Sequence, residues 1–259
     1  MLKKTGILFM ILLWIASAGV VPAEEARPLF HVIELGGVIT SPSAKYVARS
    51  LEEATAAKAE GLIILLDTPG GLDTAMRDIA KSILNAPLPV IVYVYPSGAR
   101  AASAGVIIAQ AAHVAAMAPG TNIGAAHPVA IGLGGSGEMD KTMSKKVEND
   151  AAAYARSIAK TRGRSEEWAE KAVRKSESIT ADEALKLNVI DVVAADIEKL
   201  LAAIDQKTVT VAGAKRKIST ARAVLDTKKM STRQGILAAI SNPNIAYLLL
   251  LIGLAGLYF

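Results

Sequence analysis

The sequence YPSGARAASAG, Tyr95–Gly105, joins a segment typical of a buried strand to a segment typical of a helix. Upstream, Leu88–Tyr95 (LPVIVYVY) is rich in β-branched and aromatic residues, as a central strand is. Downstream, Val106–Ala112 (VIIAQAA) continues with helical spacing. Ser103 therefore falls at the mouth of a turn, where the first N–H groups of a helix stabilise developing negative charge. The alternative is that Ser103 only caps the helix.

Short apolar runs alternate with Ala-rich helical stretches on both sides of this turn. The expected strands are Leu29–Leu35, Gly61–Leu66, Leu88–Tyr95 and His113–Ala118, and the helices between the first three are Ser43–Ala59 and Leu72–Leu84. This alternation predicts parallel crossover units, and hence an α/β fold with a mostly parallel sheet covered on both faces. We expect one folded domain over residues 28–227.

The second half of the chain is predicted to be mostly helical before it ends in a small hairpin. The expected elements are a loop at Gly120–Ala126, helices at Asp140–Arg162 and Glu166–Lys175, a third helix opened by the capping-box spacing of Thr180 and Glu183, a strand at Val189–Val193, and a hairpin from Thr208–Val211 to Lys215–Lys217. The Gly-rich stretch Ile131–Gly137 is either a lid or a plain linker. Lys141, Lys145 and Lys146 lie early in a helix, where they oppose its macrodipole.

Composition excludes several classes of function. The chain has 259 residues, of which 52% are hydrophobic, so it can bury a large core. It has no cysteine, and its three histidines form no metal-binding motif, so we expect neither a metal nor a cofactor. The net charge of +5 is carried by scattered basic residues, which gives nucleic-acid binding little support.

Both ends of the chain are apolar. Lys3 and Lys4 precede an apolar run that ends in small residues, which predicts a signal peptide over residues 1–23, with cleavage after Ala23 or, as second choice, Ala18. An uncleaved anchor helix is the alternative. Residues 244–259 carry no charge and are predicted to be a membrane segment after a juxtamembrane linker at 228–243. The segment is shorter than the usual span, which is typical of an incomplete one. The folded part would then be tethered to the membrane outside the cytoplasm, unless this end forms a peripheral amphipathic hairpin.

Two glycine-containing turns follow neighbouring strands, at the edge where parallel sheets bind ligands. The turn at Gly70–Gly71 can approach a substrate closely because glycine lacks a Cβ atom. The N–H groups of Gly71 and Ala104 would form a two-donor oxyanion hole beside Ser103. Read alone, a glycine pair of this kind is also an ordinary turn.

Three motifs in this order resemble those of the ClpP-class serine proteases, and most closely the NfeD family of membrane-bound proteases. They are Asp67–Gly71 (DTPGG), Ala101–Gly105 (AASAG) and Ala118–Pro128 (APGTNIGAAHP), and the similarity extends over about residues 28 to 259. The resemblance implies a ClpP/crotonase-like fold of stacked ββα units and peptide hydrolysis by a Ser–Lys dyad. It also implies cleavage of apolar stretches, stomatin-like membrane proteins as substrates or partners, and a homo-oligomer, a dimer or larger.

The resemblance places the nucleophile on Ser103 and the lysine on Lys146, which precedes the Ala153-Tyr154 helical register. A lysine accepts the serine proton only as a neutral amine, a form that burial or an unfavourable helix end promotes. His127 is the alternative base, because soluble ClpP-like proteases use a histidine. Its orienting carboxylate would be Asp67, Asp140 or Asp150.

Two other functions fit the same motifs. A crotonase-like acyl-thioester enzyme would use the N–H groups of Gly71 and Ala104 to polarise a thioester carbonyl, although a signal peptide argues against it. A scaffold that binds stomatin-like membrane proteins without cutting them is the second. Long NfeD proteins continue with further membrane helices and a small β-barrel domain, whereas this sequence stops inside its first apolar run, which puts stable anchoring in question.

Overall fold

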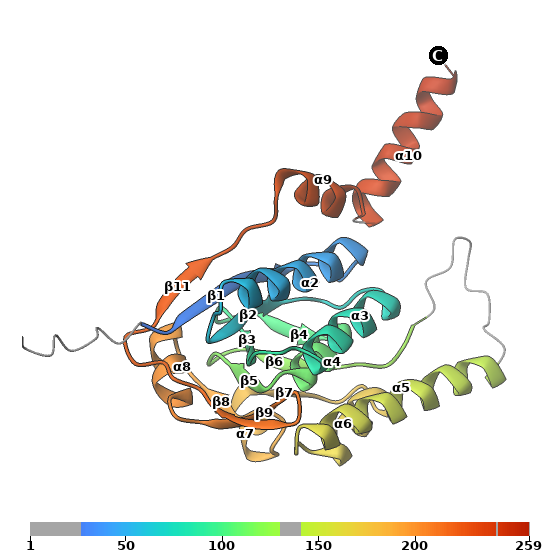
Figure 1. The fold of residues 1–259 in the computed structure, drawn as a ribbon. Coiled ribbons are helices and arrows are strands. Elements are labelled where there is room, and N and C mark those ends of the chain that lie inside the picture. The colour runs from blue at the N-terminus through green and yellow to red at the C-terminus, as the bar shows by residue number, and fades with distance from the viewer. Residues whose placement is uncertain (1–26, 130–140, 242, 259) are drawn as a thin grey trace, which may run out of the picture.

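The computed structural model describes residues 27–129, 141–241 and 243–258 (Figure 1). The predicted signal peptide, the stretch Ile131–Gly137 and Asp140 lie outside these residues. At the centre is a six-stranded sheet in which each strand runs parallel to its neighbours. Its order is β11 (Val224–Thr227), β1 (Leu29–Gly36), β2 (Gly61–Asp67), β3 (Val90–Val94), β5 (Val114–Met117) and β8 (Val192–Val193).

Both faces of this sheet are buried, as the continuous apolar runs predict. Along β1, Ile33 and Leu35 join one hydrophobic cluster, whereas Phe30 and Val32 join the cluster on the opposite face. Successive side chains of a strand point to opposite faces, so a strand covered on both sides has no polar alternation. The α/β class predicted from the sequence is confirmed by this arrangement.

Helices on one face of the sheet hold the larger of the two cores. They are α2 (Ser41–Ala56), α3 (Asp73–Leu84), α4 (Ala104–Ala111), α5 (Lys141–Thr161), α6 (Glu166–Arg174) and α7 (Ala181–Lys186). The opposite face is covered by α8 (Ile197–Ile204) and the antiparallel hairpin of β9 (Thr208–Val211) and β10 (Ala214–Lys217). The predicted hairpin is confirmed, and so is the capping box of Thr180 and Glu183 at the start of α7.

A second, smaller sheet lies beyond the end of the first. It contains β4 (Arg100–Ala102), β6 (Asn122–Gly124) and β7 (Ser178–Thr180), and Thr68 at the end of β2 forms a bridge to Ala101. The loop predicted at Gly120–Ala126 was therefore wrong in part, because β6 lies within it. Strands of three residues carry no periodic signal. The order strand, strand, helix occurs twice, as β3–β4–α4 and β5–β6–α5.

The C-terminal residues leave the body of the molecule as two helices, α9 (Thr232–Ile240) and α10 (Pro243–Tyr258). Figure 1 shows α10 projecting away from the sheet. In the part of the chain that the structure describes, no single helix is long and apolar enough to cross a membrane. Taken together, α9 and α10 have the length and apolar composition of a membrane span, but the chain bends by 73° between them. The stretch predicted as a linker, 228–243, thus contains α9.

Candidate active site

Ser103 lies between β4 and α4 in a backbone conformation that is rare for a serine. Its φ is 51° and its ψ is −111°, and its side chain makes no capping hydrogen bond to α4. The Ser103 N–H donates to the Gly124 carbonyl oxygen of β6 at 3.2 Å, so the small sheet fixes this conformation. The alternative that the Ser103 hydroxyl caps the helix is therefore wrong. A non-glycine residue held in such a region stores of order 1 to 3 kcal/mol of strain, which is common at functional sites.

The turn after β2 is tied to the serine turn through Thr68, which is fully buried. Its hydroxyl donates to the Gly37 carbonyl oxygen at 2.7 Å and accepts from the Gly70 N–H at 3.0 Å. Its main chain bonds β4 on both sides: the Thr68 N–H donates to the Arg100 carbonyl at 2.8 Å, and the Ala102 N–H donates to the Thr68 carbonyl at 3.1 Å. The two turns are therefore one hydrogen-bonded unit.

Gly70 lies against Ser103 and cannot carry a side chain without displacing it. Its φ is +118°, and a Cβ atom added there would stand 2.7 Å from the Ser103 Cβ and 3.1 Å from its Oγ. The sequence predicted a close approach of the glycine turn to a substrate. The structure adds that the glycine also makes room for the serine itself.

The N–H of Gly71 is directed away from Ile39, which lies between β1 and α2. The Ile39 N–H donates to the Gly70 carbonyl at 2.8 Å, and the Leu72 N–H donates to the Ile39 carbonyl at 2.9 Å. In this parallel pattern the residue between the two bonded positions turns its own N–H to the other side. Gly71 lines the cavity together with Ser103 and Ala104. Ala104 is the first residue of α4, where a helix N–H has no intrahelical acceptor.

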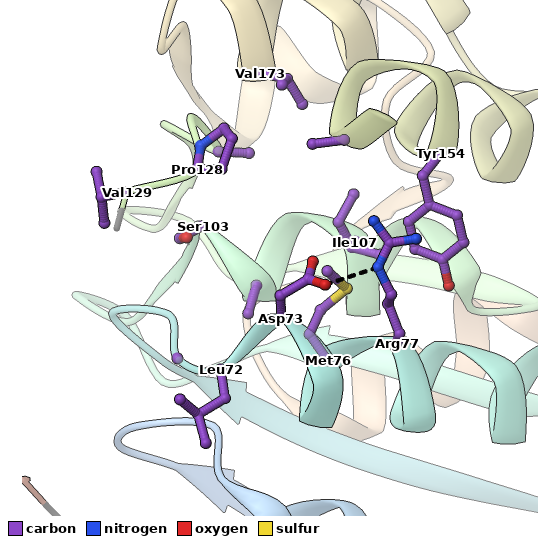
Figure 2. Close-up of a pocket in the computed structure, with 14 residues that line it drawn as sticks. Leu72, Asp73, Met76, Arg77, Ser103, Ile107, Pro128, Val129, Tyr154 and Val173 are labelled. Atoms are coloured by element: carbon purple, nitrogen blue, oxygen red, sulfur yellow. Dashed lines mark hydrogen bonds and ion pairs between the residues drawn. The ribbon is translucent and has the colours of Figure 1, made fainter. Parts of the chain in front are cut away.

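A cavity of about 310 Å³ opens in front of Ser103 (Figure 2). Most of its wall is apolar and comes from α3, α4, α5, α6 and the segment after β6. The lining residues are Gly71, Leu72, Asp73, Met76, Arg77, Ser103, Ala104, Ile107, Ala126, Pro128, Val129, Ala151, Tyr154 and Val173. An apolar pocket with a few polar groups at one end suits a hydrophobic side chain next to a group that is held for reaction.

The polar side of this wall is organised by Arg77, which bridges α3 and α5. Its Nε donates to Asp73 Oδ2 at 2.8 Å, its Nη2 donates to Asp150 Oδ2, and its guanidinium carbon lies 4.3 Å from the centre of the Tyr154 ring. Burial opposes the charged form of Arg77, but the hydrogen bonds and charges of Asp73 and Asp150 outweigh it and raise its pKa. Burial raises the pKa of Tyr154, so its hydroxyl stays neutral.

Lys146 lies in the N-terminal half of α5, and its side chain is exposed. It is not among the residues that line the cavity. Among the described residues it forms no ion pair. Its assignment as the base stays a prediction.

His127 is half-buried beside the cavity, between the lining residues Ala126 and Pro128. Its Nδ1 lies 3.1 Å from the Val173 carbonyl oxygen, and since a carbonyl only accepts, Nδ1 carries the proton in this contact. Neither described candidate for an orienting carboxylate bonds to it. Asp67 accepts from the Arg100 N–H at 3.0 Å, and Asp150 is bonded to Arg77.

Metal chemistry gains no support from the described residues, in which no three His, Asp or Glu side chains are grouped to hold an ion.

Several parts of the site were not predicted from the sequence. Thr68 stands inside a quoted motif, yet only the structure shows what its hydroxyl binds. Arg77 and Tyr154 lie 77 residues apart on two separate helices, so nothing local in the sequence connects them.

A serine held in a strained conformation between a strand and a helix, at the edge of an apolar cavity, is an arrangement that suits a serine nucleophile. Residues 30–214 match the family described as NfeD1b, N-terminal domain. The chain belongs to this family.

Two curated relatives are similar in sequence. The membrane-bound protease PH1510 of Pyrococcus horikoshii is 38% identical over 234 residues, which cover 90% of this chain and 53% of that protein. The membrane protein NfeD1b of Bacillus subtilis is 36% identical over 104 residues, covering 40% of this chain and 23% of the relative. The chain thus spans about half the length of the first relative and less than a quarter of the second.

Two solved structures are similar in fold. One is a lysine-to-alanine variant of the 1510-N membrane-bound stomatin-specific protease in complex with a substrate peptide, with a TM-score of 0.76 and 36% identity, covering 83% of this chain and 98% of that one. The other is a serine-to-alanine variant of the same protease, with a TM-score of 0.74 and 37% identity, covering 80% and 100%. The fold described above resembles that of this protease.

Proposed function

We propose that this protein is a membrane-associated serine endopeptidase that uses Ser103 as its nucleophile and Lys146 as its base. The observation that carries the proposal is the Ser103 turn. Its hydroxyl makes no capping bond, its backbone is strained, and it faces an apolar cavity. A structural serine would gain nothing from that strain, whereas a nucleophile gains exposure and alignment.

The N–H groups of Gly71 and Ala104 are proposed as the oxyanion hole. Both residues line the cavity next to Ser103, and the Gly71 N–H is turned away from Ile39 by the bonds on either side of it. Preorganised donors of this kind contribute about 2.7 to 4 kcal/mol each to the stability of a transition state. They would stabilise the negative charge that develops when the serine adds to a peptide carbonyl.

Lys146 is proposed as the base on the strength of the family resemblance and of its position on α5, the helix that supplies Ala151 and Tyr154 to the cavity wall. The relative that was solved with a substrate peptide carries a lysine-to-alanine change, which also directs attention to a lysine. The contact of His127 with the Val173 carbonyl gives that side chain a structural task.

The proposed substrates are apolar stretches of membrane-associated proteins. The cavity offers Met76, Ile107 and Val173 to a substrate side chain, and such a wall favours a hydrophobic group of similar size. The relative of known structure is described as stomatin-specific, so we propose a stomatin-like substrate. Membrane association is proposed from the apolar helix α10 and from the membrane-bound relatives, with the protease domain on the extracytoplasmic side.

The test is a peptide-cleavage assay on the full chain in detergent, with an apolar and a polar peptide of equal length. Ser103→Ala and Lys146→Ala should each lower the rate on the apolar peptide by about a thousandfold or more, because members of a catalytic unit are not additive. Lys160→Ala, which removes another exposed lysine of α5, is the matched control and should keep the normal rate.

His127→Ala should keep much of the activity. If Lys146→Ala cleaves at a near-normal rate while His127→Ala is inactive, the dyad is wrong and the base is His127. If the wild-type chain binds the peptide and does not cleave it, the scaffold function replaces the protease. Hydrolysis of an acyl-thioester in place of the peptide would favour the crotonase-like alternative.

A further inference from the structure

Arg77 connects the wall of the cavity to the stretch of α5 that carries Lys146. Its bond to Asp150 and its contact with the Tyr154 ring are both made to α5, whereas its bond to Asp73 stays within α3. Figure 2 shows the guanidinium of Arg77 between Asp73 and Tyr154.

Lys146, Asp150 and Tyr154 follow one another at intervals of four residues along α5. Residues at this spacing lie on the same side of a helix as neighbours. Asp150 is therefore the carboxylate that the helix itself would offer to the amine of Lys146. A lysine at this spacing from an aspartate commonly pairs with it, and the pairing favours the charged amine.

The two carboxylates nearest to Lys146 along α5, those of Glu148 and Asp150, are both bonded to arginines of other helices. Asp150 is bonded to Arg77 of α3, and Glu148 lies 3.1 Å from Arg174 Nη1 of α6, which also bonds Asn149. Lys146 is left without an acidic partner among the described residues. A general base must be neutral when it accepts a proton, so an unpaired lysine is better suited to that role than a paired one.

We propose that Arg77 is a positioning residue for the reaction: by holding the Asp150 carboxylate against α3, it keeps that carboxylate away from the amine of Lys146. The inference rests on the proposed function of Lys146 as the base. Arg77 then does more than line the cavity, because it also fixes the position of the Asp150 carboxylate. The charged groups on or against this stretch of α5 are Lys145, Glu148 and Asp150 on α5 itself, Asp73 and Arg77 on α3, and Arg174 on α6.

The experiment measures peptide cleavage by the full chain as a function of pH for Arg77→Gln, Asp150→Asn and the double variant. In Arg77→Gln the freed Asp150 pairs with Lys146, so the pH at which activity is half-maximal should rise by roughly 0.2 to 0.7 unit, as expected of one exposed pair. The rate near neutral pH should fall about two- to fivefold with little change in KM. Arg49→Gln, which breaks an exposed pair with Glu53 on α2, is the matched control and should leave the profile unchanged.

The double variant separates this role from a merely structural one. If Arg77 keeps the Asp150 carboxylate away from Lys146, then Asp150→Asn alone stays close to the wild type. Adding Asp150→Asn to Arg77→Gln should then restore the wild-type rate at neutral pH and the wild-type pH profile. If Arg77 only ties α3 to α5, all three variants lose activity alike and no profile shifts, which overturns the inference. A near-normal Lys146→Ala chain overturns the proposed dyad and this inference with it. An inactive Lys146→Ala chain beside an unaffected Arg77→Gln chain overturns the inference alone.

Discussion

At the scale of the residue, the site depends on a serine whose backbone is held in a costly conformation by its neighbours. The position of Ser103 in a turn between a strand and a helix was predictable, because β-branched residues precede it and small helix-forming residues follow. Its φ of 51° was not predictable, since it depends on one hydrogen bond to Gly124 and on the close approach of Gly70, and both residues are distant in sequence.

Gly70→Ala should abolish most peptide cleavage, because the new Cβ atom would collide with Ser103 at 2.7 Å. Gly37→Ala is the matched control. Its φ is also positive, at +75°, but no atom lies within 4 Å of the added Cβ, so it should cost stability without a comparable loss of rate. The two variants are compared by kcat and by thermal unfolding. A Gly70→Ala enzyme with a normal kcat would show that this contact does not position the serine.

At the scale of the element, the long elements were predictable from the sequence, whereas several of the short strands were not. The helix predicted at Asp140–Arg162 is α5, Lys141–Thr161, because Ala-rich helical spacing continues over most of its length. The strand expected at Val189–Val193 is only β8, and β4, β6, β7 and β11 were not predicted. These short strands are defined by pairing with distant segments, which a local pattern does not contain.

Filling the cavity from α5 should change substrate preference. Ala151 lines the cavity, whereas Ala153 is exposed on the same helix. Ala151→Leu should lower kcat/KM about tenfold for peptides with a large apolar residue at the cleavage site and spare those with a small one, since one or two methylene groups in a pocket are worth about 1 to 3 kcal/mol. Ala153→Leu should leave both values unchanged. Equal losses on the two peptides would mean that the cavity does not hold the substrate side chain.

At the scale of the whole molecule, the end of β2 in the large parallel sheet meets β4 and β6 of the small sheet, and the serine lies at this junction. The sequence predicted this position because both glycine turns follow strands. It could not predict the walls of the cavity, which depend on how α3, α5 and α6 pack. Beneath the site, Arg162 and Arg164 donate at 2.8 and 2.7 Å to the last carbonyls of α4, those of Ala111 and Gln110.

The same region should make the fold sensitive to acid. His113 is buried, its Nδ1 accepts the Val90 N–H at 3.1 Å, and burial with the charges of Arg162 and Arg164 lowers its pKa to about 3. An unfolded histidine binds a proton near pH 6.5, so its contribution to stability is present above that pH and is lost as the pH falls towards 3. From pH 7 to pH 4 the loss is about 3 kcal/mol.

His113→Asn keeps an acceptor for the Val90 N–H and removes the titration. Its free energy of unfolding, measured by urea denaturation, should therefore fall less steeply between pH 7 and pH 4 than that of the wild type. Arg49→Gln serves as the control and should follow the wild-type slope. The same slope in His113→Asn and wild type would contradict the role given to this histidine.

The nucleophilic role of Ser103 is tested most directly by covalent labelling of the full chain with a fluorophosphonate, followed by mass spectrometry of its peptides. We expect one adduct, located on Ser103, formed in step with the loss of peptide cleavage and absent from Ser103→Ala. An adduct on another residue, or full loss of cleavage with Ser103 unmodified, would contradict it.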